Sequence, residues 1–134
     1  MFTITKVFNF PMGHRLSNLT KSKCVFVHGH NFKLEITVKS SILNKNDMVM
    51  DFSNLKKLVN SIIDTWDHGM FLNKNDDRLM SSECATIHYI DGDPTAEKLC
   101  LFLYNNIEGI LPKNVSIHSV IIWETDDSKA TYSE

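Results

Sequence analysis

The sequence predicts an α+β fold in which two helices cover one face of an antiparallel sheet. Two observations carry this prediction. Near both ends of the chain polar and apolar residues alternate, as in half-buried strands, whereas two central segments place apolar residues three or four positions apart, as in amphipathic helices. Strands grouped around two such helices favour a layered arrangement. The chain has 134 residues, 43% of them hydrophobic, which suits a single domain over residues 1–134.

Two strands are predicted before the first helix. The first covers residues 2–10, and Pro11 and Gly13 are expected to mark its end. The second lies in N-F-K-L-E-I-T-V-K, which begins at Asn31 and alternates apolar with polar residues throughout. We expect these strands to form an antiparallel hairpin with one buried face.

The first helix is predicted from an apolar stripe that runs from Leu55 to Trp66 at helical spacing. Its N-terminus can be capped by Ser53 or by Asp51, and the sequence leaves both choices open. A short strand is predicted after it, over residues 86–90.

The second helix opens in D-P-T-A-E-K, where Asp93 is the predicted N-cap and Pro94 the first helical residue. Gly109 and Pro112 are expected to end it. A long β-rich run follows over residues 115–125, and a last strand is predicted at residues 130–132.

Composition narrows the classes of partner. The formal charge of −2 gives no electrostatic reason to expect nucleic acid or a membrane surface as a partner. No apolar run approaches the roughly 18 residues of a membrane helix, and the alternating N-terminus does not look like a signal peptide. Three cysteines, Cys24, Cys84 and Cys100, suit a reducing compartment better than a disulfide scaffold, so we expect a cytoplasmic protein.

Three histidines form the first candidate site. His28 and His30 flank Gly29, and residues two apart in a strand project to the same side. His14 is the natural third ligand of a catalytic zinc site, because a hairpin returns the chain past it. The alternative is that these are ordinary hydrogen-bonded histidines, since H-G-H alone is a weak signal.

Other polar residues are candidates for catalysis or ligand binding beside a metal site. Cys24 precedes His28 by four residues, and a nearby cation would favour its thiolate form. Asp67 can orient the neighbouring His68 after the first helix. Glu124 lies within an apolar strand, where a carboxylate needs a partner such as a ligand with paired N–H donors. Alone, each of these signals is weak.

Six ordered segments together are far more specific. They are F-N-F-P-M-G-H, C-V-F-V-H-G-H-N-F, M-V-M-D-F-S-N-L-K, W-D-H-G-M-F-L-N, D-P-T-A-E-K-L and W-E-T-D-D-S-K-A-T-Y. With them the chain resembles the 6-pyruvoyl-tetrahydropterin and 6-carboxy-tetrahydropterin synthase family over nearly its whole length. The resemblance implies the tunnelling fold (T-fold) and a homo-oligomer, often a hexamer built as a dimer of trimers, with active sites between subunits.

The resemblance also implies roles for individual residues. It implies that zinc is held by His14, His28 and His30, and that Cys24 is the proton-abstracting thiolate. Asp67 and His68 would complete an acid/base relay. Glu124 would anchor the pterin ring of the substrate, with Thr95 and Glu97 near the pocket. Arg15, Lys21 and Lys23 are near enough in sequence to meet the triphosphate, although basic side chains are usually only solvated.

The resemblance favours one member of the family. Carboxy synthases have three residues between the cysteine and H-G-H, as V-F-V here, whereas animal pyruvoyl synthases have a longer spacer. We therefore expect a zinc-dependent lyase that converts 7,8-dihydroneopterin triphosphate to 6-carboxytetrahydropterin, acetaldehyde and triphosphate for queuosine synthesis. A pyruvoyl synthase, a non-catalytic zinc-binding protein and a purely structural domain are the alternatives. Pro11-Met12-Gly13 departs from the small residues common in the family before the first histidine.

Overall fold

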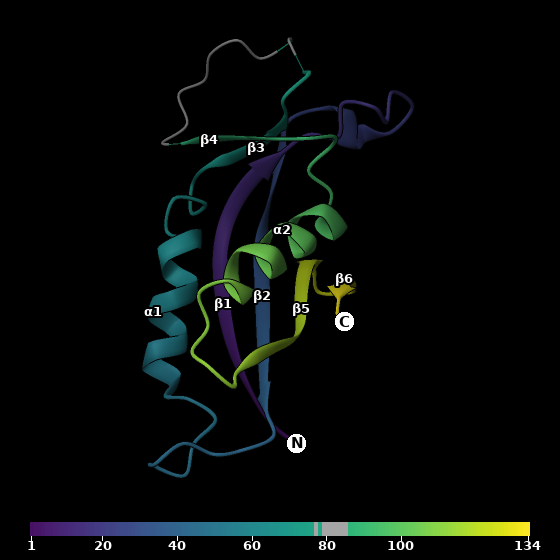
Figure 1. The fold of residues 1–134 in the computed structure, drawn as a ribbon. Coiled ribbons are helices and arrows are strands. Elements are labelled where there is room, and N and C mark those ends of the chain that lie inside the picture. The colour runs from purple at the N-terminus through teal and green to yellow at the C-terminus, as the bar shows by residue number, and fades with distance from the viewer. Residues whose placement is uncertain (77, 79–85) are drawn as a thin grey trace.

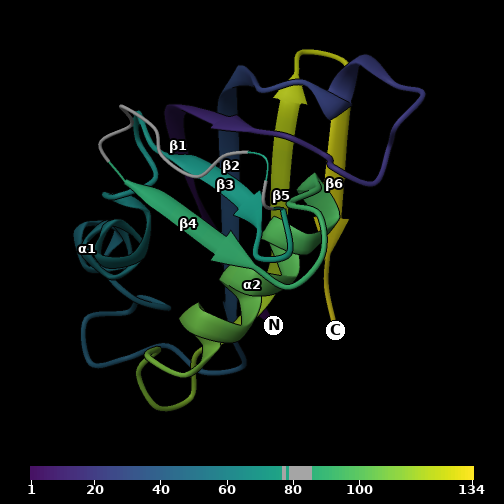
Figure 2. The same ribbon diagram turned by 90° about the horizontal axis from the view of Figure 1, so that it is seen from above.

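The computed structural model describes residues 1–76, 78 and 86–134, and Cys84 lies outside them. Among these residues, six strands form a single sheet in the order β4-β3-β1-β2-β5-β6, and both helices lie on the same face of it (Figures 1 and 2). In chain order the elements are β1 (Phe2–His14), a 3-10 turn (Lys23–Val25), β2 (His28–Ser40), α1 (Phe52–Ile63), β3 (Met70–Asn73), β4 (Ile87–Ile90), α2 (Ala96–Glu108), β5 (Ser116–Thr125) and β6 (Ser128–Tyr132). The layered α+β architecture is confirmed.

The hairpin of β1 and β2 is longer than predicted. Its antiparallel register runs from Phe2 opposite Ser40 to His14 opposite His28, so the strand does not end at Pro11. Pro11 fits within the strand because its backbone groups point away from β2. The Pro11 carbonyl accepts a hydrogen bond from the His68 N–H at 2.8 Å, on the side away from β2. The missing N–H of Pro11 therefore costs no bond within the hairpin.

The strand β3 was not predicted, and it makes the sheet mixed instead of purely antiparallel. It pairs in parallel with the end of β1, where Gly13 lies opposite Met70, and in parallel with β4 along its whole length. All four of its residues are buried. A short strand that is buried on both faces shows no alternation, so its sequence carried no period to detect.

Capping residues fix where the helices begin. The Asp51 carboxylate accepts from the backbone N–H groups of Ser53 and Asn54, so Asp51 is the N-cap of α1. The prediction for α2 was wrong, because its N-cap is Thr95 and the helix starts at Ala96. The Asp93 carboxylate is instead bonded to a distant loop, as described below. Gly109 caps the C-terminus of α2, as predicted.

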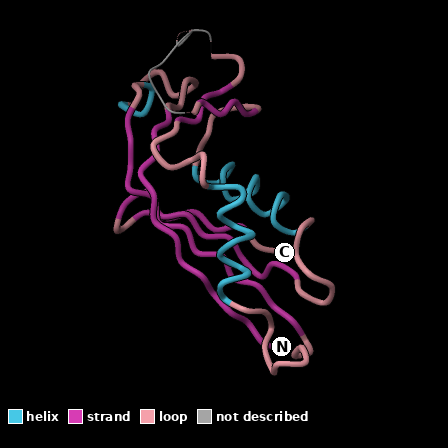
Figure 3. The backbone as a smooth tube through the Cα atoms, turned by 90° about the vertical axis from the view of Figure 1, so that its left-hand side faces the viewer, coloured by secondary structure: helices cyan, strands magenta, loops and turns pink. Residues whose placement is uncertain are grey.

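The core lies between the helices and one face of the sheet. Alternate residues of β1 and β2 point into it, including Phe8, Phe10, Phe32 and Leu34. Figure 3 shows the long strands running the length of the molecule with both helices beside them. The same face continues beyond the Phe10–Phe32 pair to His30 and His14, so the apolar core gives way to histidines at one end of the sheet.

None of the helices in the described ranges has the length and apolar character that crossing a bilayer requires.

Candidate metal centre and active site

The hairpin register brings three imidazoles together. His14 lies opposite His28, and His30 is the next residue of β2 on the same face. The ring centroids of His14 lie 4.6 Å from His28 and 5.3 Å from His30, and those of His28 and His30 are 5.0 Å apart. One nitrogen from each ring lies within 4.8 Å of the other two. These three side chains form a cluster that could bind a metal ion.

The donor set fits a metal with one open position. The Nδ1 of His14 lies 2.8 Å from the Pro94 carbonyl oxygen, and the Nδ1 of His28 lies 2.8 Å from that of Phe26. Each ring can therefore donate from Nδ1 and keep the Nε2 lone pair for an ion, the usual outer-shell arrangement of metal-binding histidines. The His14 Nε2 is buried and has no hydrogen-bond partner among the described residues. A metal would satisfy this atom, and three imidazoles leave a fourth tetrahedral position free.

Burial favours the neutral form of His14 and His30. It lowers the pKa of His14 from 6.5 to about 4; the Pro94 carbonyl raises this pKa, and the neighbouring imidazoles of His28 and His30 lower it further. The pKa of His30 is lowered by burial, against the opposing effect of the Glu124 carboxylate. Neutral imidazole is the form that binds metals, so the lowered pKa values of His14 and His30 favour metal binding near neutral pH.

A carboxylate faces the cluster from the neighbouring strand. The Glu124 Oε1 lies 3.8 Å from the His14 Nε2, which is beyond hydrogen-bond reach. The Glu124 side chain is 29% exposed and thus remains accessible to a ligand. The structure places Glu124 beside the histidines, although β5 and β1 are not adjacent strands.

Cys24 lies in the 3-10 turn of the loop that joins β1 to β2. Its carbonyl accepts from the Leu16 N–H at 2.8 Å, and its own N–H donates to the Ser22 hydroxyl at 3.1 Å. The loop is thereby tied back to the segment that directly follows His14. The thiol is free and half-buried. Among the described residues, the candidate metal cluster consists of the three histidines and does not include Cys24.

Asp67 and His68 contact each other in the turn between α1 and β3. The His68 Nδ1 is paired with the Asp67 carboxylate, while the two side chains are 79% and 50% exposed, respectively. A cavity of about 520 Å³ is lined by His28, His30 and His68 together with Gly29. The structure therefore brings His68 to the edge of the cluster but leaves the Asp67–His68 pair open to solvent.

Thr95 and Glu97 have ordinary roles in the helix start. The Thr95 hydroxyl caps α2 by accepting from the Lys98 N–H at 3.3 Å, and Glu97 is exposed in the first turn. The link from this segment to the cluster is Pro94, whose carbonyl contacts His14. Pro94 was not predicted as a site residue, because any residue type carries a backbone carbonyl and the sequence does not indicate which one contacts His14.

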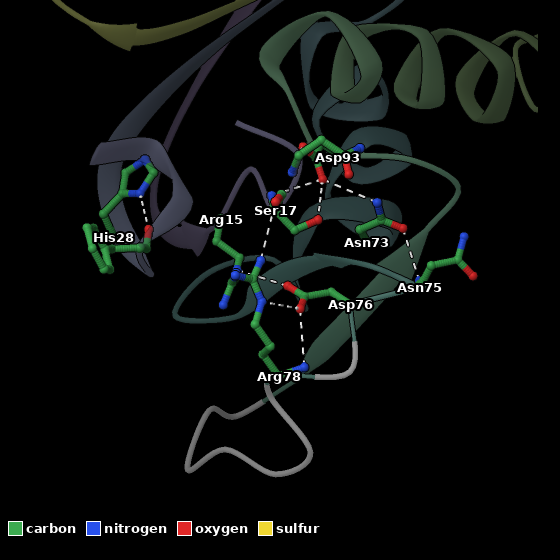
Figure 4. A network of polar contacts seen from close by, with 10 residues as sticks. Arg15, Ser17, His28, Asn73, Asn75, Asp76, Arg78 and Asp93 are labelled. Carbon is green, nitrogen blue, oxygen red and sulfur yellow. Dashed lines mark hydrogen bonds and ion pairs between the residues drawn. The ribbon is translucent and has the colours of Figure 1, made fainter. Parts of the chain in front are cut away.

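A polar network that includes Arg15, the residue after His14, was also not predicted (Figure 4). The Arg15 Nε lies 2.9 Å from the Asp76 Oδ2, with both side chains buried, though the two groups are not aligned as a hydrogen bond. The Arg78 Nε lies 3.4 Å from the other Asp76 oxygen. Arg15 is therefore committed to an internal ion pair, not exposed to meet a phosphate group.

Known proteins are similar to this chain over nearly its whole length. The sequence model of the family described as 6-pyruvoyl tetrahydropterin synthase matches residues 3–134. The 6-carboxy-5,6,7,8-tetrahydropterin synthase of Aquifex aeolicus is 34% identical, over 98% of this chain and 97% of that protein. The enzyme of the same name from Haemophilus influenzae is 34% identical over the full length of both.

Solved structures show the same fold. The 6-pyruvoyl tetrahydropterin synthase of Caenorhabditis elegans superimposes with a TM-score of 0.72 at 22% identity, over 99% of this chain and 95% of that one. This likeness confirms the tunnelling fold that the sequence resemblance implied. From the family match over nearly the whole sequence, and from relatives about one third identical, it follows that this chain belongs to the 6-pyruvoyl tetrahydropterin synthase family.

Proposed function

We propose that the chain is a zinc-dependent 6-carboxy-5,6,7,8-tetrahydropterin synthase. The observation that carries this proposal is the cluster of His14, His28 and His30, with the buried His14 Nε2 left for a metal. The relatives from Aquifex aeolicus and Haemophilus influenzae bear this name, and the three-residue spacer V-F-V between Cys24 and His28 agrees with it.

The reaction would convert 7,8-dihydroneopterin triphosphate and water to 6-carboxytetrahydropterin, acetaldehyde and triphosphate. The atoms of substrate and water equal those of the three products. No external oxidant or reductant is needed, because the carbons of the side chain are oxidised while the pterin ring is reduced. A bound zinc ion would supply Lewis acidity toward the hydroxyl oxygens of the substrate side chain. We assign this role to zinc because three imidazoles with an open position are typical of its catalytic sites.

The chain's own residues would bind the pterin and move protons. The Glu124 carboxylate would accept two N–H groups of the pterin ring, and this pairing would fix the substrate beside the histidines. The Cys24 thiolate would take a proton from the substrate side chain, and His68, oriented by Asp67, would return or relay one. Thr95 and Glu97 would lie at the rim of this pocket.

We further propose that the active sites lie between the subunits of a homo-oligomer, a hexamer arranged as a dimer of trimers. Support comes from the exposure of Asp67 and His68, which leaves room for a second subunit over them. The sheet of the described residues also ends in β4 and β6, whose outer edges carry unpaired backbone groups. Pairing of such edges is a common way to join subunits.

A second candidate is a 6-pyruvoyl synthase. It is favoured by a relative from Poecilia reticulata, described as a 6-pyruvoyl tetrahydrobiopterin synthase, which is 31% identical over 96% of this chain and 88% of that protein. A non-catalytic zinc-binding protein with the same fold is disfavoured, because metal storage does not need Cys24, the Asp67–His68 pair or Glu124.

Product analysis tests this proposal. Purified zinc-loaded protein is incubated with dihydroneopterin triphosphate, acetaldehyde is assayed, and the pterin is identified by mass spectrometry. The carboxy synthase releases acetaldehyde and 6-carboxytetrahydropterin. A pyruvoyl product without acetaldehyde would assign the second candidate, and unchanged substrate would favour the binding protein.

A further inference from the structure

The carboxylate of Asp93 accepts hydrogen bonds from Ser17, Asn18 and Asn73, and this set of contacts is called the Asp93 clamp (Figure 4). The Asp93 Oδ1 accepts from the Ser17 N–H at 3.0 Å, from the Ser17 hydroxyl at 2.7 Å and from the Asn73 side-chain amide at 3.2 Å. Its Oδ2 accepts from the Asn18 N–H at 2.8 Å. One side chain thus joins the loop after β1, the end of β3 and the segment before α2.

The next residue of the chain contacts the candidate metal site directly. The peptide group between Pro94 and Thr95 is held at both of its ends. Its N–H donates to the Asp93 carbonyl at 2.9 Å, and its carbonyl oxygen lies 2.8 Å from the His14 Nδ1. The orientation of this carbonyl therefore depends on where Asp93 is anchored.

The two contacts act on one short stretch of chain. Asp93 holds Ser17 and Asn18, while Pro94 holds the ring of His14, only three residues earlier. If the Asp93 anchor were lost, the Pro94 carbonyl and His14 could move relative to each other. The hydrogen bond that selects the Nδ1–H tautomer of His14 would then weaken.

We propose that Asp93 is a positioning residue of the metal site, which holds the Pro94 carbonyl against His14 so that Nε2 points at the ion. This inference rests on the proposed metal site and adds to it a residue that touches neither metal nor substrate. It also explains why Asp93 does not cap α2: its acceptor capacity is already used by donors from outside the helix.

The charge state of Asp93 agrees with this role. Partial burial raises the pKa of the carboxyl, but the hydrogen bonds from Ser17, Asn18 and Asn73 outweigh burial and hold the pKa below its usual range. The group is therefore ionised near neutral pH and accepts at both oxygens. An asparagine offers a single acceptor oxygen, and its amide would turn a donor toward a donor of the loop.

The test compares two substitutions two residues apart. Asp93→Asn breaks the clamp, whereas Asp91→Asn removes only an exposed ion pair with Lys74 and serves as the control. Zinc affinity is measured by competition with a chromogenic chelator, and the absorption spectrum of the Co²⁺-substituted protein reports the ligand geometry. The unfolding free energy of each metal-free variant is measured in parallel, which separates a general loss of stability from an effect on the site.

We expect Asp93→Asn to bind zinc about 10- to 100-fold more weakly, with an altered Co²⁺ spectrum, as for other outer-shell substitutions. Asp91→Asn should match the wild type. A folded Asp93→Asn protein with wild-type affinity and spectrum would overturn the inference. Should this variant fail to fold, Ser17→Ala replaces it, because it removes one donor of the clamp: several-fold weaker zinc binding supports the inference, and unchanged binding overturns it.

These outcomes are separate from the fate of the proposed function. Wild-type protein that binds no zinc would refute the metal site itself. Equal zinc affinity in the wild type and in Asp93→Asn would refute only the role of Asp93.

Discussion

At the scale of single residues, the burial of His14 links stability to pH. Its pKa is lowered from 6.5 to about 4 in the folded chain, so between these values the unfolded state binds more protons than the folded state. The unfolding free energy of the metal-free protein should therefore fall as the pH drops from about 6.5 to about 4, by up to about 3 kcal/mol.

Urea denaturation across this pH range measures the effect. His14→Asn removes the titrating ring, so its stability should change less with pH than that of the wild type. Equal slopes for both proteins would show that other groups control the pH dependence.

The two described cysteines should behave in opposite ways. Cys24→Ala should keep zinc but lose activity by about 10²- to 10⁴-fold, the usual contribution of a general base. Cys100→Ala is the matched control. Cys100 belongs to α2 and lies in the core, and burial raises the pKa of its thiol to about 12. Zinc content and turnover are measured for both. Full activity in Cys24→Ala would refute its role as the base.

Some residues of the candidate site were predictable from the sequence, and others were not. The histidine cluster was predictable, because the spacing of His28 and His30 and the hairpin to His14 follow from strand geometry. The Pro94 carbonyl and the Asp93 clamp were not predictable. They depend on where the chain before α2 meets the loop after β1, and this meeting is set by packing across the whole sheet.

At the scale of elements, the turn between α1 and β3 requires a glycine. A Cβ on Gly69 would lie 2.7 Å from the Thr65 carbonyl oxygen and 3.1 Å from those of Trp66 and Thr86. These are backbone atoms that cannot move independently of the turn. Gly69→Ala should therefore lower the unfolding free energy by about 1–3 kcal/mol, as measured by chemical denaturation.

Gly109 provides the matched control for that substitution. It ends α2 with a φ of −70°, and a Cβ there would meet no atom within 4 Å. Gly109→Ala should be neutral or stabilise by about 0.4–1 kcal/mol, because alanine has fewer unfolded conformations. Equal destabilisation by both substitutions would contradict the role of close contact at Gly69.

Elements differed in how well the sequence predicted them. The alternating strands and the helical stripes were found because one face of each meets water. The strand β3 was hidden by its full burial. The cap of α2 was misplaced by two residues, since Asp93 and Thr95 are both good caps and only the tertiary donors of Ser17 and Asn18 distinguish them.

At the scale of the whole molecule, two features lead to a prediction about assembly: the exposed pair of Asp67 and His68, and the position of β4 and β6 as the outermost strands among the described residues. Light scattering of the purified protein should give a mass near that of six chains. An active monomer at assay concentration would contradict the proposal that sites lie between subunits.

The central claim is that a zinc ion held by His14, His28 and His30 supports the carboxy synthase reaction. The most direct measurement is acetaldehyde release from dihydroneopterin triphosphate as metal-free protein is titrated with zinc, with bound metal determined by elemental analysis. We predict that the rate rises in proportion to bound zinc and levels off at about one ion per chain, and that His28→Ala neither holds zinc nor releases acetaldehyde. Acetaldehyde release at the full rate from metal-free protein, or equal zinc content in His28→Ala and the wild type, would contradict the account.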